Sequence, residues 1–574
     1  MNQTLLSNIS GTFLFFLACL LLGASYLSYE RSLCETLEAE SAIIARAYAT
    51  GQARFINQLD GKEDLDKPPL YYWVIAGFSF FAPNWEMAAR LPSLLSLAIF
   101  VLLFFAISAS MGRTGPFFFL WSVMFLFCPK ILWMGQIARM DMFFSATCFL
   151  ALFFFMKGAG LLNVENDGER PNIIEGRYLA GLFVSAAASV MMKGPLGAIL
   201  IFVPIILFVL AERRFVLLKR VFLSPYLLLF LALCLPWYVY VTVKTDFRFF
   251  HRFILEENLS RFTSLLPGGG FKEFNHSPST RYLVYFLTGF FPWSLMALFW
   301  IPAFLRKWMA LRPVSRFFLL DFAFVFIFFS MAVSKRSDYI LPLYPAAAFL
   351  GAEYALFQGK PSTLSRLMRF VIVLVMAICG LLAVAGILSH FLDVSAIFAH
   401  AFHVKNPALI PFFVSILKSQ TLLFLFLALS FLLVLVFGIR RFSKDRPAIA
   451  LDSFNILAGL LICCLMLFTL PAIYKGKDAR PFCRKVEEIV GEKPLYYGGF
   501  WDEECSFYLK RKVTRVDISK VEYLFKKRDK QVFFILDGKR YRLLKKWGLN
   551  FPLEYRDKGL VLRTLVLVWN LNKT

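Results

Sequence analysis

The sequence lacks the features by which a soluble protein of this length is recognised. Charged residues make up only 17% of the 574 residues, whereas hydrophobic residues make up 59% and the mean hydropathy is +0.65. No internal repeat is visible, and the Phe-rich runs are the only compositional bias. A soluble domain does not need this much apolar sequence. The composition therefore predicts a polytopic membrane protein.

Cysteines are scarce in the polar segments. Most of the ten lie inside apolar runs, as Cys148 and Cys234 do, and are predicted to be small core residues. Cys34, Cys483 and Cys505 fall in polar segments. If the C-terminal part is extracytoplasmic, Cys483 and Cys505 either form a disulfide or remain free thiols.

A basic segment is missing at the N-terminus. The residues before the apolar run 9–29 read MNQTLLSN and contain no Lys or Arg. A cleaved signal peptide begins with a positively charged region. We therefore expect residues 9–29 to form an uncleaved first helix.

Acidic residues are in the minority, with 38 Asp and Glu against 62 Lys and Arg and a net charge of +24. In a soluble protein this excess would indicate a nucleic-acid partner. Here many basic residues lie in short loops between apolar runs, where they fix topology and attract anionic lipid and phosphate. We expect membrane lipids, and no nucleic acid, as partners.

Apolar runs predict an all-α polytopic bundle of about thirteen transmembrane helices. The runs lie near 9–29, 92–111, 115–134, 142–157, 178–192, 196–211, 224–243, 282–304, 317–333, 339–357, 369–389, 418–438 and 454–472. The run 70–82 is short and follows Pro68-Pro69, so we interpret it as a helix lying at the interface.

The loops divide into two kinds. With a cytoplasmic N-terminus, the short basic loops all fall on the cytoplasmic side. The other side receives two large loops, 30–91 and 244–281, and the polar residues 479–574. We expect 1–473 to be the transmembrane domain and 479–574 an extracytoplasmic α/β domain. Its predicted strands are KPLYYG, QVFFILDG and LVLRTLVLV, and its predicted helices are PFCRKVEEIV and ISKVEYLFKKR.

Unusual polar residues gather in the outer segments. They are Glu35 and Glu38 in the first loop, Asp66-Lys67 before the double proline, Asp141, Lys193, Asn258, Arg261, His276, Lys335, Arg336, Tyr339 and Tyr344. Each has an ordinary alternative, such as a solvated turn, a helix cap, a snorkelling lysine or an interfacial tyrosine. Because all map to one face, and charges beside a bilayer are costly, together they predict a functional site.

The order of these motifs resembles one family. An acidic pair, DKPPLYYW, AARLPS, ARMDM, MKGP, PWYVYV, ENLSRF, FFPWS and SKRSDYILPLYPAAA together resemble the integral-membrane GT-C glycosyltransferases. That family includes protein O-mannosyltransferases and the aminoarabinose transferase of lipid A. The resemblance covers about residues 30–350. The family has Asp-Glu some fifteen residues before a Gly, where this chain has Leu37-Glu38 before Gly51.

The resemblance implies a hexosyl or pentosyl transferase of the bacterial inner membrane, with its active site on the extracytoplasmic side. The donor would be a sugar on a polyprenyl phosphate, and the acceptor an envelope lipid, first of all lipid A. A protein Ser or Thr is the alternative acceptor. Glu38 is the best substitute for the missing Asp and Glu35 the second, while Glu38 or Asp141 would align the acceptor or act as base.

The leaving phosphate needs cations rather than a general acid, and Lys67, Lys193, Arg261 and Lys335 are the candidates. No cofactor is required by the motifs. Carboxylates near phosphate would accept a divalent metal, but no spacing demands one, and His400 and His403 are read as interfacial. A lipid-linked sugar transporter and a non-catalytic relative remain as competing readings, although the two related halves typical of transporters are not seen.

Overall fold

The computed structural model describes residues 31–35, 37–163, 174–259, 280–332, 335–358, 361–392, 409–442, 470–509, 511, 513–527, 531–549, 551, 553–557 and 564–570. The predicted helix 9–29 and nearly all of the predicted span 454–472 lie outside these residues.

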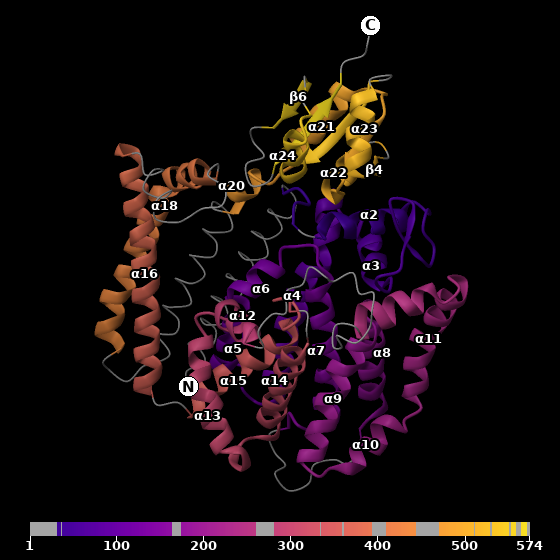
Figure 1. Cartoon of the computed structure of the whole chain (residues 1–574). Helices are drawn as coiled ribbons and strands as arrows, with labels where there is room; N and C mark the ends of the chain where they lie inside the picture. The colour runs from indigo at the N-terminus through magenta and orange to yellow at the C-terminus, as the bar shows by residue number, and fades with distance from the viewer. Residues whose placement is uncertain are drawn as a thin grey trace.

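The molecule is a helical bundle with a small sheet domain above one end (Figure 1). The central helices are α4 (Trp85–Ser110), α7 (Met140–Gly158), α8 (Gly176–Lys193), α9 (Pro195–Ala211), α14 (Pro313–Met331) and α15 (Tyr344–Glu353). Their facing sides form one continuous apolar core that is rich in stacked phenylalanines, among them Phe104, Phe149 and Phe318. Many of the phenylalanines in the described residues thus fill this core.

Proline and glycine interrupt several of the predicted spans. The run 115–134 forms two helices, α5 (Pro116–Leu126) and α6 (Pro129–Met134). The run 282–304 forms α12 (Arg281–Gly289) and α13 (Ser294–Arg306), which meet at 113°. Within the described residues, five helices are long and apolar enough to cross a membrane, or six if this bent pair is one span. The count of about thirteen stays a prediction.

The remaining bundle elements lie around this core. They are α10 (Phe215–Phe222), α11 (Tyr226–Lys244), η1 (Phe250–Leu259), η2 (Trp308–Ala310), η3 (Leu341–Leu343), η4 (Tyr354–Gln358), α16 (Pro361–Phe391), α18 (Leu409–Phe442) and α20 (Leu470–Lys475). Helices α16 and α18 pair along their length at one side of the bundle (Figure 1).

The first outer segment lies between the bundle and the sheet domain. It consists of α2 (Glu38–Ala49), an antiparallel hairpin of β1 (Asn57–Leu59) and β2 (Lys62–Asp64), and α3 (Leu70–Phe78). Helix α3 begins directly after Pro68-Pro69 and packs on α2, α4 and α8. Its nine residues are too few to cross a bilayer, which agrees with the interfacial interpretation of 70–82.

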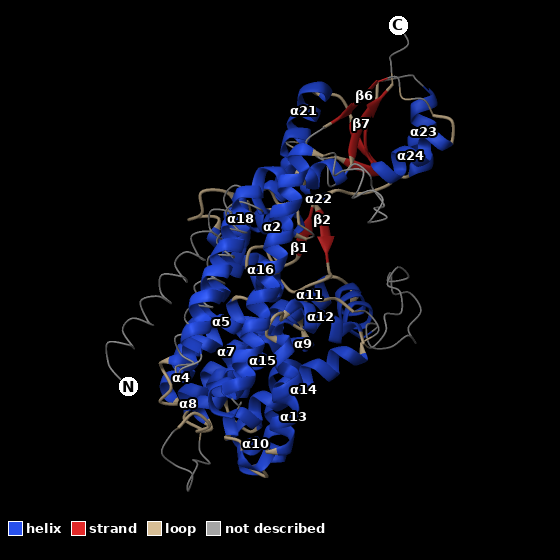
Figure 2. Ribbon diagram, turned by 90° about the vertical axis from the view of Figure 1, so that its left-hand side faces the viewer, coloured by secondary structure: helices blue, strands red, loops and turns tan. Residues whose placement is uncertain are grey.

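The C-terminal part is a five-stranded mixed sheet flanked by helices (Figure 2). The strand order is β4-β3-β5-β7-β6, from β3 (Leu495–Gly498), β4 (Thr514–Val516), β5 (Phe533–Asp537), β6 (Leu553–Arg556) and β7 (Leu565–Trp569). The helices are α21 (Arg480–Val490), α22 (Glu503–Tyr508), α23 (Ile518–Lys527) and α24 (Gly538–Lys546). The predicted strands and helices of the α/β domain are all present. Cys483 and Cys505 are both buried free thiols, so the disulfide alternative is wrong for this structure.

Helix α24 was not among the predicted helices, and the predicted strand QVFFILDG included Asp537-Gly538. The Asp537 side chain instead accepts a hydrogen bond from the backbone N–H of Arg540 and caps the helix.

Candidate active site

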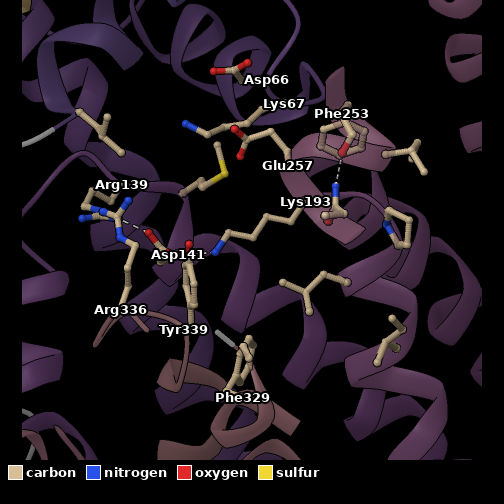
Figure 3. Close-up of a pocket in the computed structure, with 18 of the residues that line it drawn as sticks. Asp66, Lys67, Arg139, Asp141, Lys193, Phe253, Glu257, Phe329, Arg336 and Tyr339 are labelled. Carbon is tan, nitrogen blue, oxygen red and sulfur yellow. Dashed lines mark hydrogen bonds and ion pairs between the residues drawn. The ribbon is translucent and has the colours of Figure 1, made fainter. Parts of the chain in front are cut away.

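A cavity of about 500 Å³ opens between the first outer segment, α7, α8, η1 and the residues before η3 (Figure 3). Its apolar walls include Phe253, Phe328 and Phe329. Its polar lining consists of Glu40, Ser41, Asp66, Lys67, Arg139, Asp141, Lys193, Glu257, Asn258, Arg336 and Tyr339. Four cations and four carboxylates therefore line the same cavity as these apolar side chains.

Asp141 is held between two cations at one end of the cavity. Its Oδ1 lies 2.5 Å from Lys193 Nζ, and its Oδ2 accepts from Arg139 Nε at 3.1 Å. Asp141 stands in the first turn of α7, and Lys193 is the last residue of α8. Because α7 and α8 pack closely along their length, residues 52 positions apart meet at the cavity.

Arg139 extends this cluster to a second carboxylate. Its Nη2 donates to Asp338 Oδ2 at 2.5 Å, and Asp338 also pairs with Lys130 at 3.3 Å and with Arg336 at 3.3 Å. Asp338 and Lys130 are buried, while the Arg336 side chain is 31% exposed. The cluster therefore holds rigid cations at its base and presents Arg336 to the cavity.

Lys67 enters the cavity from the opposite wall. Pro68-Pro69 prevent α3 from extending backwards, and the Lys67 carbonyl accepts a hydrogen bond from Asn57 Nδ2 at 2.8 Å. Its ammonium lies 3.4 Å from Glu40 Oε1. Burial lowers the pKa of Lys67, but Glu40 and two neighbouring aspartates outweigh it and raise that pKa above its usual value. Lys67 is therefore protonated and positively charged at neutral pH.

Asp64 and Asp66 lie on the same side as Lys67. Asp64 has a raised pKa of about 6 because burial and the nearby Asp66 both disfavour its charge. Asp66 accepts from Arg252 Nε of η1 at 2.8 Å, and Glu63 pairs with Arg248, two residues before η1, at 2.9 Å. These pairs fasten η1 to the hairpin, so that Glu257 and Asn258 of η1 complete the cavity wall.

Of the first-loop carboxylates, Glu40 lines the cavity and the predicted Glu38 does not. Glu38 is fully buried and pairs with Arg31 and Arg90, both at 2.8 Å. It also accepts from the N–H of Ala138 at 2.9 Å, which fixes the turn before Asp141. Burial would raise the pKa of Glu38, but the two arginines lower it to about 2. Glu38 does not line the cavity, so we assign it a positioning role instead of the predicted role of base.

Three further predicted residues also lie off the cavity. Glu35 pairs with Lys477 at 2.6 Å. Lys335 is 8% exposed and donates to the carbonyl of Ala332 at 2.5 Å. Tyr344 is fully buried against Phe290. Of the predicted set, the structure brings together Asp66, Lys67, Asp141, Lys193, Asn258, Arg336 and Tyr339, whereas Arg261, His276, His400 and His403 lie outside the described residues.

Glu40, Arg139, Glu257 and Asp338 were missed as site residues. Each stands within two residues of a predicted one, so charge in the same motif was the available signal. Within the described ranges, no group of three or more His, Cys, Asp or Glu is arranged to hold a metal. Lys67, Lys193 and Arg336 give the cavity the chemistry of an anion site instead.

Comparison with solved structures identifies the fold. ArnT of Cupriavidus metallidurans bound to undecaprenyl phosphate superimposes with a TM-score of 0.73 and 18% identity, over 98% of this chain and 99% of that one. Its apo structure gives a TM-score of 0.71 and 17% identity. No family model matches the chain.

The comparison of sequences also finds proteins named as arabinosyl transferases. An undecaprenyl phosphate-alpha-4-amino-4-deoxy-L-arabinose arabinosyl transferase of Enterobacter sp. (strain 638) is 25% identical over 296 residues, 50% of this chain and 49% of its own length. A protein of the same name from Shewanella sediminis is 31% identical over 177 residues, 30% of each chain. An uncharacterized protein of Aquifex aeolicus is 26% identical over 306 residues, 51% of this chain and 54% of its own length. The chain thus spans about half the length of the curated relatives it matches.

Proposed function

We propose that this chain, which has the fold of the integral-membrane GT-C glycosyltransferases, transfers a sugar from a polyprenyl-phosphate carrier to an envelope lipid. Lipid A or a similar phosphate-bearing glycolipid is the proposed acceptor. The observation that carries the proposal is the meeting of Lys67, Lys193 and Arg336 in one cavity that also has apolar walls, among them Phe253, Phe328 and Phe329. An isoprenoid phosphate has an anionic headgroup and an apolar chain, so its binding site needs cations and apolar walls together. The names of the similar proteins support the same donor.

The proposed location is the bacterial inner membrane, with the cavity and the C-terminal domain outside the cytosol. In Figure 1 the basic helix α10 and the turn between α13 and α14 lie at the lower end of the bundle. Helix α2, which lines the cavity, and α3, which follows the cavity-lining Lys67, lie nearer the upper end. Short basic loops remain on the cytoplasmic side, which favours this orientation.

The reaction is a single displacement at the anomeric carbon. An acceptor oxygen forms a bond to that carbon while the bond from carbon to the carrier phosphate oxygen breaks. The electron pair leaves with the phosphate, and Lys67, Lys193 and Arg336 stabilise the added negative charge. Inversion at the anomeric carbon follows from one displacement.

The proton of a hydroxyl acceptor goes to a carboxylate, and we assign that role to Glu40. Glu40 lines the cavity, its side chain is 18% exposed, and it pairs with Lys67 at 3.4 Å. Asp141 is already bound by Lys193 and Arg139 and acts by holding those cations in place. If the acceptor is an ionised phosphate, no base is needed and Glu40 contributes only alignment.

The test is transfer by purified protein in lipid nanodiscs. Undecaprenyl phosphate carrying a radiolabelled sugar is supplied with lipid A, with a Ser/Thr peptide, or with no acceptor. The proposal expects carrier phosphate release and labelled lipid A in the first sample alone. Label on the peptide would identify a protein O-glycosyltransferase. Movement of intact donor across the bilayer without release would identify a transporter and overturn the proposal.

A further inference from the structure

Helix α24 has two faces of different chemistry. Tyr541 and Leu544 are buried in the core between the sheet, α23 and α24. The opposite face is exposed and repeats at the three- and four-residue spacing of a helix surface. It consists of Lys539, Arg542, Leu543, Lys546 and, directly after the helix, Trp547. We call these five residues the α24 outer face.

The outer face exposes both apolar and cationic groups. Leu543 is 38% exposed and Trp547 is 44% exposed, because no other described residue covers these two side chains. Lys539, Arg542 and Lys546 make no ion pair within the described part of the chain. Three unpaired cations beside a leucine and a tryptophan are typical of helices that lie in a membrane interface.

Positive charge is concentrated in the half of the domain that contains α24. Helices α23 and α24 contain eight Lys and Arg and one Glu, whereas α21 and α22 contain three Lys and Arg and four Glu. Helices α21 and α22 pack on the other face of the sheet from α23 and α24. Among the described helices of the domain, the excess of positive charge therefore lies on the side of the sheet that α23 and α24 cover.

The orientation of the domain is fixed by contacts of α22 with the first outer segment and with the start of α4. Tyr508 donates to Glu86 at 2.8 Å, and Ser506 donates to Asp60 at 2.8 Å. The Arg46 guanidinium lies 4.6 Å from the centre of the Phe507 ring. In both views α24 lies in the lower part of the domain, and in Figure 1 it is level with the upper ends of α16 and α18.

We propose that the α24 outer face rests on the anionic headgroup layer of the surrounding membrane. Lys539, Arg542 and Lys546 contact lipid phosphates, and Leu543 and Trp547 enter the boundary between headgroups and chains. Because the bundle spans the membrane, this partner is present wherever the protein is. An acidic protein would leave Trp547 without a matching surface. The proposal does not depend on the proposed transferase activity.

The test uses the full chain in nanodiscs of phosphatidylcholine, with or without 30% phosphatidylglycerol. A photocrosslinking benzophenone amino acid replaces Leu543 in one sample and Arg484, an exposed residue of α21, in the control. Mass spectrometry then counts lipid adducts. We expect phosphatidylglycerol adducts at position 543 to exceed those at position 484 at least fivefold.

Charge reversal tests the electrostatic part. Lys539→Glu/Arg542→Glu/Lys546→Glu should cut phosphatidylglycerol adducts at position 543 at least fivefold, the effect of about one lost cation near an anionic surface. Arg484→Glu/Lys485→Glu/Lys493→Glu, the matched change on the other face, should leave them unchanged. Unchanged melting temperatures show that both variants remain folded. Equal adduct yields at the two positions, or adducts that require added glycolipid acceptor, would overturn the proposal.

Discussion

Lys193 Nζ lies 2.5 Å from Asp141 Oδ1, and the same carboxylate accepts from Arg139 on its other oxygen. The carboxylate therefore holds two cations that would otherwise repel each other. Both cations line the cavity. Asp141 thus fixes the positions of the Lys193 and Arg139 charges before any substrate binds.

Asp141→Asn should lower transfer at least a hundredfold, because Lys193 and Arg139 lose the charge that positions them at the leaving phosphate. Lys193→Met should cause a loss of similar size. Transfer is measured in membranes at matched expression. Asp246→Asn, which changes an exposed aspartate of the turn between α11 and η1, is the matched control. Near-normal rates in both site variants would remove this cluster from the active site.

Glu40→Gln and Glu38→Gln should affect different properties. Glu40→Gln should leave the melting temperature unchanged and lower transfer to a hydroxyl acceptor by about a hundredfold. Glu38→Gln leaves Arg31 and Arg90 buried without a full counter-charge, at a cost of about 3 kcal/mol or more, so the melting temperature should fall by several degrees. Reversal of this pattern, with a stable but inactive Glu38→Gln, would restore Glu38 as the base.

The difference between Glu38 and Glu40 shows where sequence reasoning stops. Lys67 and Asp141 were predicted because charges bordering apolar runs must meet a polar site. Glu38 and Glu40 are two positions apart on the helix, so their side chains lie about 200° apart around its axis. Which of them faces the cavity depends on where α2 begins, and it begins after Leu37, whose φ of 69° is rare for a residue with a side chain.

Contacts between residues far apart in the chain also could not be predicted from the sequence. Asp338 meets Arg139 across 199 residues because α6, α7 and the segment before η3 pack at one place. No local pattern specifies that contact. The α/β domain, by contrast, was largely predictable because alternation and helical spacing are local signals.

Asp64 should make stability fall as pH rises. Its pKa is about 6 in the folded protein and 3.8 in the unfolded chain, so the stability it contributes is fully present below about pH 4 and lost above pH 6. The loss is on the order of 2 kcal/mol after allowing for solvent screening. Asp64→Asn should therefore raise the melting temperature relative to the natural protein by clearly more at pH 8 than at pH 4.5. A difference in melting temperature that does not change with pH, or one equal to that of Asp246→Asn, would contradict this account.

The most direct measurement is the affinity of the purified protein for undecaprenyl phosphate, before and after Lys67→Met. One charged hydrogen bond to phosphate contributes about 1.5–3 kcal/mol, so the substitution should weaken binding by about tenfold to a hundredfold. Lys62→Met, on the exposed strand β2 five residues before Lys67, should leave affinity unchanged. Equal affinities of the natural protein and Lys67→Met would contradict the claim that this cavity holds the carrier phosphate.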